Sequence, residues 1–169
     1  MPRARRAQAR AATQAESADV AAFREGLRAK RAGENAHLLL LGLRVVDTAA
    51  LLERIHAGLA YGALERFQRN IALTLEQLAA LIQINPRTLA RRRSEGRLAA
   101  DESDRLVRAS RLLGKALALF EGDADAAREW LGAKAPALGG RTPLAAAQTE
   151  TGAREVENLI GKLEHGVFP

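Results

Sequence analysis

Residues 74–96 read TLEQLAALIQINPRTLARRRSEG, and this stretch predicts two short helices joined by a tight turn. Thr74 and Gln77 have the spacing of a capping box, in which each side chain satisfies the other residue's free backbone amide. Asn85 is a strong N-cap, and Pro86 occupies the first helical position, where its missing N–H costs nothing. The expected structure is a helix-turn-helix.

The apolar residues of the same stretch agree with two packed helices. Leu78 and Ile82 lie one helical turn apart and are expected to face inward, with the small Ala79 where the helices cross closely. Leu89 anchors the second helix. Gly96 ends it, because glycine readily adopts the left-handed conformation found after helices.

The second helix of such a motif reads the major groove of DNA. Residues in its first turn and one turn later are expected to reach base edges or phosphates, and these are Arg87, Thr88 and Arg91. The basic residues beyond them are expected to contact phosphates, which position a protein without specifying a sequence. They are Arg92, Arg93 and Arg97. The alternative is a helical hairpin whose arginines form only a solvated face.

Gln83, in the turn, departs from the usual motif. Such turns commonly have glycine at this place, because the backbone there often needs a positive φ. A glutamine is accommodated at some strain, so the DNA-binding role depends on a turn that tolerates it.

The composition of the chain agrees with helices and excludes several classes of protein. The chain has 169 residues, only 4% of them aromatic, and is dominated by Ala, Leu and Arg, so an all-α fold is expected. It has no cysteine, which excludes a disulfide scaffold, a thiolate metal site and a cysteine nucleophile. Its histidines, His37, His56 and His165, match no metal-ligand spacing. We expect a soluble, cytoplasmic protein with no metal, no cofactor and no membrane span.

Charge is divided unevenly along the chain, whose formal net charge is +6. Residues 1–33 carry eight basic and three acidic groups, and residues 71–100 carry five and two. Residues 34–70 balance at four and four, whereas residues 101–169 carry nine basic and eleven acidic groups. Two functions on one chain would produce this division, and so would a solvated arm joined to a neutral domain.

Helices are also expected on both sides of the central motif. Over Ser17–Arg31, Val20, Phe23 and Leu27 form a stripe too thin to bury much alone, so this helix is expected to pack on a partner subunit or to lie over the core. A helix capped by Asp47 or Thr48 is expected to bury Leu52, Ile55 and Leu59, with His56 partly buried beside them.

After the motif, the longest helix is expected to begin at Asp101, and further helices follow Asp123, Pro143 and Thr151. The last of these helices has an apolar stripe formed by Val156, Leu159, Ile160 and Leu163.

Six short patches stand out in order along the chain: INPRTLARRR at 84–93, GRL at 96–98, ESDRL at 102–106, AREWL at 127–131, ALGGRTPL at 137–144 and GKLEHGVF at 161–168. Together they resemble the Xre/MbcA/ParS antitoxins of type II toxin–antitoxin modules, especially those paired with RES-domain toxins. The resemblance runs from about residue 40 to residue 168.

This resemblance implies a helix-turn-helix domain continuous with a small helical toxin-binding domain. The expected parts are a basic arm with a possible dimerisation helix at 1–33, an Xre-like helix-turn-helix domain at 34–122 and a toxin-binding domain at 123–169. RES-type toxins deplete cellular NAD⁺, and their antitoxins cover the active-site entrance with the C-terminal end. The implied partners are a cognate RES-domain toxin, the module's own promoter DNA and a second copy of the chain.

Carried over to this chain, the family's terminal motif assigns toxin contact to Lys162, Leu163, Glu164, His165, Gly166 and Val167. Lys162 stands where many members are expected to have arginine, and lysine lacks the planar fork suited to bidentate contacts. From the residues alone, the alternative is a frayed helix end with His165 favourably placed at the negative pole.

Other functions explain less of the sequence. An enzyme is not expected, because no glycine-rich phosphate loop follows a strand and no nucleophile stands in an activating motif. A transcription regulator without a toxin partner explains the arginines but gives no reason for GKLEHGVF. Residues 1–33 could also bind nucleic acid without sequence preference.

Overall fold

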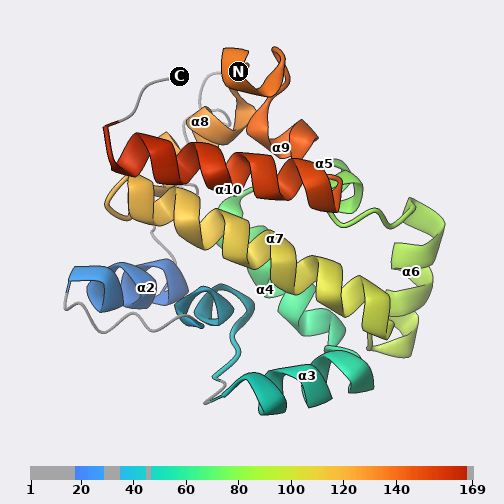
Figure 1. Ribbon diagram of the computed structural model, residues 1–169. Coiled ribbons are helices and arrows are strands. Elements are labelled where there is room, and N and C mark those ends of the chain that lie inside the picture. The colour runs from blue at the N-terminus through green and yellow to red at the C-terminus, as the bar shows by residue number, and fades with distance from the viewer. Residues whose placement is uncertain (1–17, 29–34, 45–46, 167–169) are drawn as a thin grey trace, which may run out of the picture.

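The computed structural model describes residues 18–28, 35–44 and 47–166, and within these ranges every named element is a helix (Figure 1), which confirms the all-α fold. The elements are α2 (Ala18–Arg28), the 3₁₀ helix η1 (Ala36–Leu41), α3 (Thr48–Ala57), α4 (Tyr61–Ile71), α5 (Leu75–Leu81), α6 (Pro86–Glu95), α7 (Ala100–Leu119), α8 (Ala124–Gly132), the 3₁₀ helix η2 (Pro136–Leu138), α9 (Pro143–Ala146) and α10 (Glu150–Glu164).

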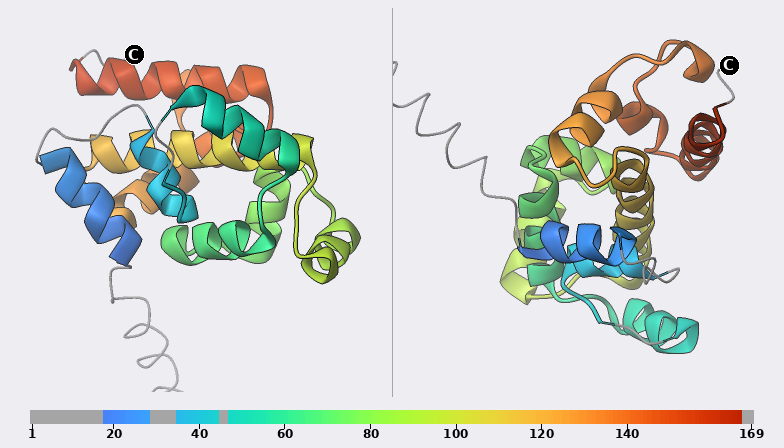
Figure 2. Two further views of the ribbon diagram at one scale, coloured as in Figure 1. Left: turned by 90° about the horizontal axis from the view of Figure 1, so that it is seen from below. Right: turned by 90° about the vertical axis from the view of Figure 1, so that its left-hand side faces the viewer.

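Helix α7 is the centre of the molecule. It is 20 residues long and packs against η1, α3 and α4 on one side and against α8 and α10 on the other (Figures 1 and 2). Leu106, Ala116 and Leu117 of α7 are buried, and each large apolar side chain buried in this way stabilises the fold by roughly 1.5–3 kcal/mol. Asp101 and Glu102 lie in its first turn, where negative charge suits the helix dipole.

Helix α2 lies over the core instead of standing apart. Val20 and Phe23 are buried, and the side chain of Asp19 forms an ion pair with Arg66 and accepts a hydrogen bond from Asn70 Nδ2 at 3.0 Å. Of the two roles expected for the thin stripe, packing on the core is therefore the one observed. Because these side chains are used within the chain, the stripe gives no support to self-association.

The Asp19–Arg66 ion pair should make the stability of the fold depend on pH. The hydrogen bond from Arg66 holds the pKa of Asp19 below its ordinary value. A carboxyl with a lowered pKa stabilises the fold above its ordinary pKa, and that contribution is lost as the pH falls through the lowered value. We expect Asp19→Asn to reduce the free energy of unfolding by about 1 kcal/mol at pH 7 and by less near pH 3, measured by urea unfolding.

The exposed Glu25 on the same helix provides the control, since Glu25→Gln removes the same charge without touching Arg66. Equal losses for Asp19→Asn at both pH values would show that the ion pair is not the cause.

Helix α3 is rotated from the expected orientation. Asp47 caps it, accepting a hydrogen bond from the Ala50 amide at 2.8 Å, and Ile55 is buried as predicted. The buried neighbour is Leu51, however, and Leu52 is 51% exposed. His56 is also exposed, so the prediction of a partly buried histidine is wrong. Helix α3 packs against α7, and Leu51 and Ile55 are its buried residues.

Candidate DNA-binding and toxin-binding surfaces

The helix-turn-helix is built as its sequence predicts. Thr74 Oγ1 accepts from the Gln77 amide at 3.1 Å, and Gln77 Oε1 accepts from the Thr74 amide at 3.0 Å, which completes the capping box at the start of α5. Asn85 Oδ1 accepts from the Thr88 amide at 2.8 Å at the start of α6, where Pro86 is the first residue. These local bonds set where both helices begin.

The packing of the two helices also agrees with the prediction. Leu78, Ile82 and Leu89 are almost fully buried, and Ala79 is 6% exposed. Gly96 follows α6 with φ +71°, the left-handed conformation expected of a glycine that ends a helix. Helix α6 is therefore fixed on its inner side by Leu89, and Arg87, Arg91 and Arg93 are exposed on its remaining surface.

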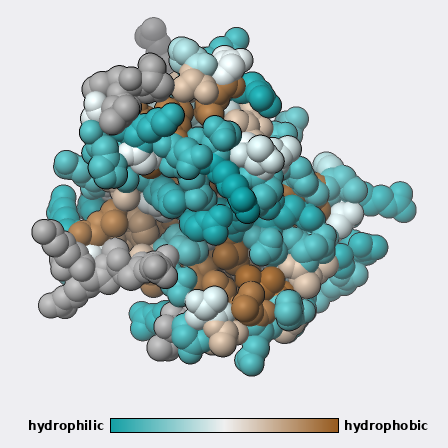
Figure 3. All heavy atoms as spheres, viewed as in Figure 1, coloured by the Kyte–Doolittle hydropathy of each residue, from teal (hydrophilic) through white to brown (hydrophobic). Residues whose placement is uncertain are grey.

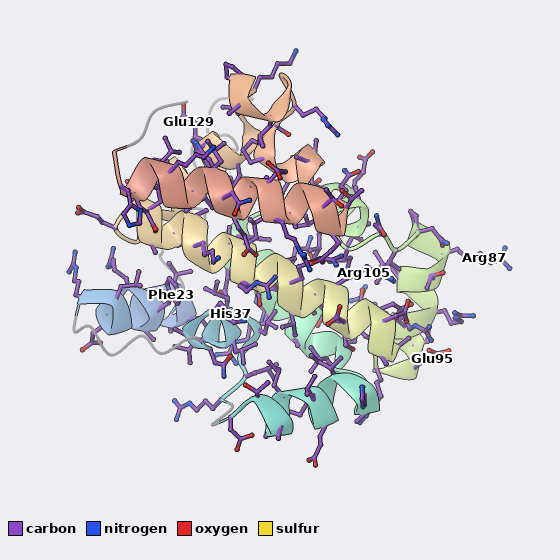
Figure 4. All side chains as sticks on the ribbon, in the orientation of Figure 1. Phe23, His37, Arg87, Glu95, Arg105 and Glu129 are labelled. Atoms are coloured by element: carbon purple, nitrogen blue, oxygen red, sulfur yellow. The ribbon has the colours of Figure 1, made fainter. Side chains whose placement is uncertain are left out.

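Three of the predicted DNA-binding residues are available to a ligand. Arg87 is exposed and points away from the body of the molecule (Figure 4), and within the described ranges its side chain has no ion pair. Arg91 is 61% exposed, with its Nε 3.7 Å from Glu95. Arg93 is 72% exposed, with its Nε 3.8 Å from Glu65. Such long, exposed contacts hold a side chain weakly.

Thr88 is half-buried in the first turn of α6. Its backbone amide binds the Asn85 side chain, so Thr88 contributes to the cap of the helix that would enter the groove.

Two of the predicted residues bond to other parts of the chain, Arg92 as a half-buried side chain and Arg97 as an exposed one. Arg92 Nε donates to Glu102 Oε2 at 2.7 Å, and Arg92 Nη1 donates to Glu95 Oε2 at 2.7 Å. These bonds, first the one to Glu102, raise the pKa of Arg92 further above its ordinary value. Arg97 Nη1 donates to the carbonyl oxygens of Ala57 at 2.6 Å and of Gly58 at 3.3 Å.

Glu102 is the anchor of the first of these contacts. It is 4% exposed, and its Oε2 also accepts from the Ala99 amide at 2.7 Å at the start of α7. Arg92 therefore fastens α6 to α7, and Arg97 fastens the chain after α6 to the end of α3.

The turn before α6 has the positive φ that the sequence suggests. Gln83 has φ +54°, and its side chain donates to the carbonyl oxygen of Gln148 at 2.5 Å. Arg105 of α7 donates to the carbonyl oxygen of Ile82 at 2.7 Å. The turn is thus held by α7 and by the segment that leads into α10.

Helix α10 carries the second candidate surface and is held firmly against α7. Thr149 caps it, so it begins at Glu150, one residue earlier than predicted. Glu157 accepts from Arg111 Nε at 3.0 Å and from Lys115 Nζ at 2.8 Å. Burial raises the pKa of Glu157, but these two bonds outweigh it and leave the pKa lowered. The apolar side of the helix is the predicted stripe, in which Val156, Leu159 and Ile160 are buried.

The C-terminal end of α10 presents polar groups to solvent. Lys162, Glu164, His165 and Gly166 are exposed, whereas Leu163 is partly buried against the core. His165 Nδ1 lies 2.7 Å from the carbonyl oxygen of Gly161, so the imidazole folds back over the last turn. The predicted contact at Val167 lies outside the described residues.

The two surfaces lie at opposite ends of the molecule. Helix α6 stands at one side in Figure 1 and the C-terminal end of α10 at the other, and the view from below in Figure 2 shows the same separation. The two candidate surfaces therefore do not overlap.

The face between these ends includes an apolar patch, below the centre in Figure 3. An open groove lies there between α2, η1, α3 and α7, lined by Phe23, Leu27, Leu51 and Val107 with Arg111 and Lys115 at its edge. In the described ranges, no group of acidic or histidine side chains could hold a metal ion, and no helix is long and apolar enough to cross a membrane.

These features define a helix-turn-helix protein with a C-terminal helical domain, and comparison with known proteins gives the family. Residues 50–111 match the antitoxin Xre-like helix-turn-helix domain, and residues 115–166 match the antitoxin Xre/MbcA/ParS C-terminal toxin-binding domain. The first match ends and the second begins within α7, so this helix contributes residues to both domains.

Two curated relatives cover most of their own length. The chain is 35% identical over 129 residues to antitoxin Xre of Yersinia enterocolitica, which is 76% of this chain and 87% of that protein. It is 35% identical over 114 residues to antitoxin Xre of Photorhabdus laumondii, which is 67% of this chain and 77% of that protein. The chain belongs to the Xre antitoxin family, whose role is regulatory and not enzymatic.

Proposed function

We propose that this protein neutralises a RES-type, NAD⁺-depleting toxin by covering the toxin's active site with the C-terminal end of α10. The observation that carries the proposal is the end of α10 itself. A helix fixed by buried Leu159 and Ile160 and by the Glu157 ion pairs ends in exposed Lys162, Glu164 and His165. These side chains offer a cation, an anion and a hydrogen-bonding imidazole to the polar subsites that a dinucleotide would use.

We further propose that α6 binds the promoter of the same module, so that the antitoxin regulates its own synthesis in the cytoplasm. The exposed Arg87, Arg91 and Arg93 support this role, with Thr88 in the first turn. Arg92 and Arg97 support it indirectly by holding α6 in place. Two chains would act together on two half-sites, as helix-turn-helix proteins commonly do. Their contact would use a surface other than buried Val20 and Phe23.

The proposal is tested with the reading frames that adjoin the gene. We expect one of them to encode a RES-domain protein that stops growth when produced alone and is tolerated when this chain is co-produced. DNA upstream of the pair is expected to bind the purified chain. With about 6–10 phosphate contacts, affinity should fall by about 10³–10⁵ between 50 and 200 mM salt. DNA binding without a neutralised neighbour would indicate a regulator with no toxin partner.

A further inference from the structure

A side chain joins the turn of the helix-turn-helix to the C-terminal domain. Gln83 Nε2 donates to the carbonyl oxygen of Gln148, between α9 and α10, although the two residues are 65 positions apart. Only residues 84 and 85 separate Gln83 from the start of α6, the helix proposed to bind DNA. A contact at this point therefore acts on the orientation of α6.

Two arginines of α7 support the same junction. Arg105 Nε donates to the carbonyl oxygen of Ile82 at 2.7 Å, next to Gln83. Arg108, one helical turn further on, forms an ion pair with Glu150 at 2.6 Å. The hydrogen bond from Arg108, followed by that from Arg154, lowers the pKa of Glu150. The turn before α6 and the first turn of α10 are thus held against neighbouring turns of one helix.

The backbone of Gln83 shows why its side chain matters. Its φ of +54° lies in the left-handed region, which is strained for a residue with a side chain, whereas glycine adopts it freely. What glutamine offers in place of glycine is a donor long enough to reach Gln148. The residue with the strained backbone is therefore the one whose side chain joins the two domains.

We propose that Gln83 is a positioning residue for DNA binding. Its bond to Gln148 fixes the angle of α6 relative to the C-terminal domain, and the arginines of α6 meet the operator at that angle. This inference rests on the proposed binding of promoter DNA by α6.

Two variants of Gln83 test the role in the full-length chain. Gln83→Gly removes the bond and relieves the backbone, and Gln83→Met removes the donor but keeps the length and the backbone conformation. We expect both to bind upstream DNA about five- to tenfold more weakly than the unaltered chain, the range for one lost hydrogen bond. Gln83→Gly should unfold at the same or a higher urea concentration, so its loss of affinity would not come from a loss of stability.

Ala72 provides a matched control. It also has a positive φ, of +49°, and it is exposed at the end of α4, so Ala72→Gly relieves a similar strain without touching the junction. We expect it to leave DNA affinity unchanged. If both Gln83 variants bind as tightly as the unaltered chain, the positioning role is refuted while the proposed DNA binding stands. If the unaltered chain does not bind the DNA, the proposed function itself fails at that point.

Discussion

A chain that ends after Ile160 is expected to lose toxin neutralisation while keeping its fold. The buried Val156, Leu159 and Ile160 remain in this variant, and so does Glu157 with its two cationic partners. Of the apolar stripe, only the partly buried Leu163 is lost. The exposed end of the helix is removed. Because a few central residues usually carry most of the energy of an interface, we expect binding to the toxin to weaken by about 100-fold or more.

The measurement is colony formation by cells that produce the toxin together with each variant, with circular dichroism to confirm that the helices remain. Glu155→Gln is the control, since it changes an exposed residue of α10 away from the end. It should rescue growth as the unaltered chain does. Full rescue by the shortened chain would mean that the toxin is bound elsewhere.

Arg87→Ala combined with Arg91→Ala is expected to weaken operator binding strongly at moderate salt and to leave toxin neutralisation intact. The two side chains lie four residues apart on one face of α6, and both are exposed. A good arginine–base contact is worth about 1–3 kcal/mol, so the double variant should lose about a hundredfold in affinity or more. If instead the two arginines contact phosphates, the affinity should fall equally for all DNA sequences. The slope of log affinity against log salt concentration should then become shallower by about two.

The control removes the same charge from another place. Lys134→Ala with Arg141→Ala takes two exposed cations from the C-terminal region, so a general effect of net charge would lower affinity equally in both double variants. We expect a large loss only for the α6 pair, measured by gel shift with the upstream DNA. Identical shifts for the two double variants would refute the assignment of α6.

The elements predicted correctly are those whose signals are local. The capping box at Thr74 and the caps at Asn85 and Asp123 depend on atoms two or three residues away, and each is present. The stripe of α10 is visible because a helix repeats its buried positions every three or four residues. Local chemistry of this kind was enough to predict the helix-turn-helix and the helical C-terminal domain.

The contacts that were missed join residues far apart in the chain. The sequence of α6 does not show whether an arginine side chain faces DNA or a buried carboxylate of the same protein. It therefore predicts a phosphate contact for Arg92, which in the structure binds Glu102. Nothing in the sequence beside Glu102 indicates that its carboxylate is buried and binds Arg92. On α3, Leu51 and Leu52 are adjacent and equally apolar, and the edge that meets α7 decides which of them is buried.

The turn before α6 predicts a positive φ at Gln83 but not the partner of its side chain. The expected positive φ at Gln83 is observed, but no feature of the sequence near residue 83 indicates its partner at Gln148. The distance along the chain hides this bond, and the structure reveals it.

Consumption of NAD⁺ by the purified toxin shows whether the end of α10 covers the toxin's active site. We predict that an equimolar amount of the full-length chain stops it, that the chain ending after Ile160 does not, and that the Arg87→Ala, Arg91→Ala variant inhibits as well as the unaltered chain. Equal inhibition by the full-length and the shortened chains would contradict the claim that the end of α10 covers the toxin's active site.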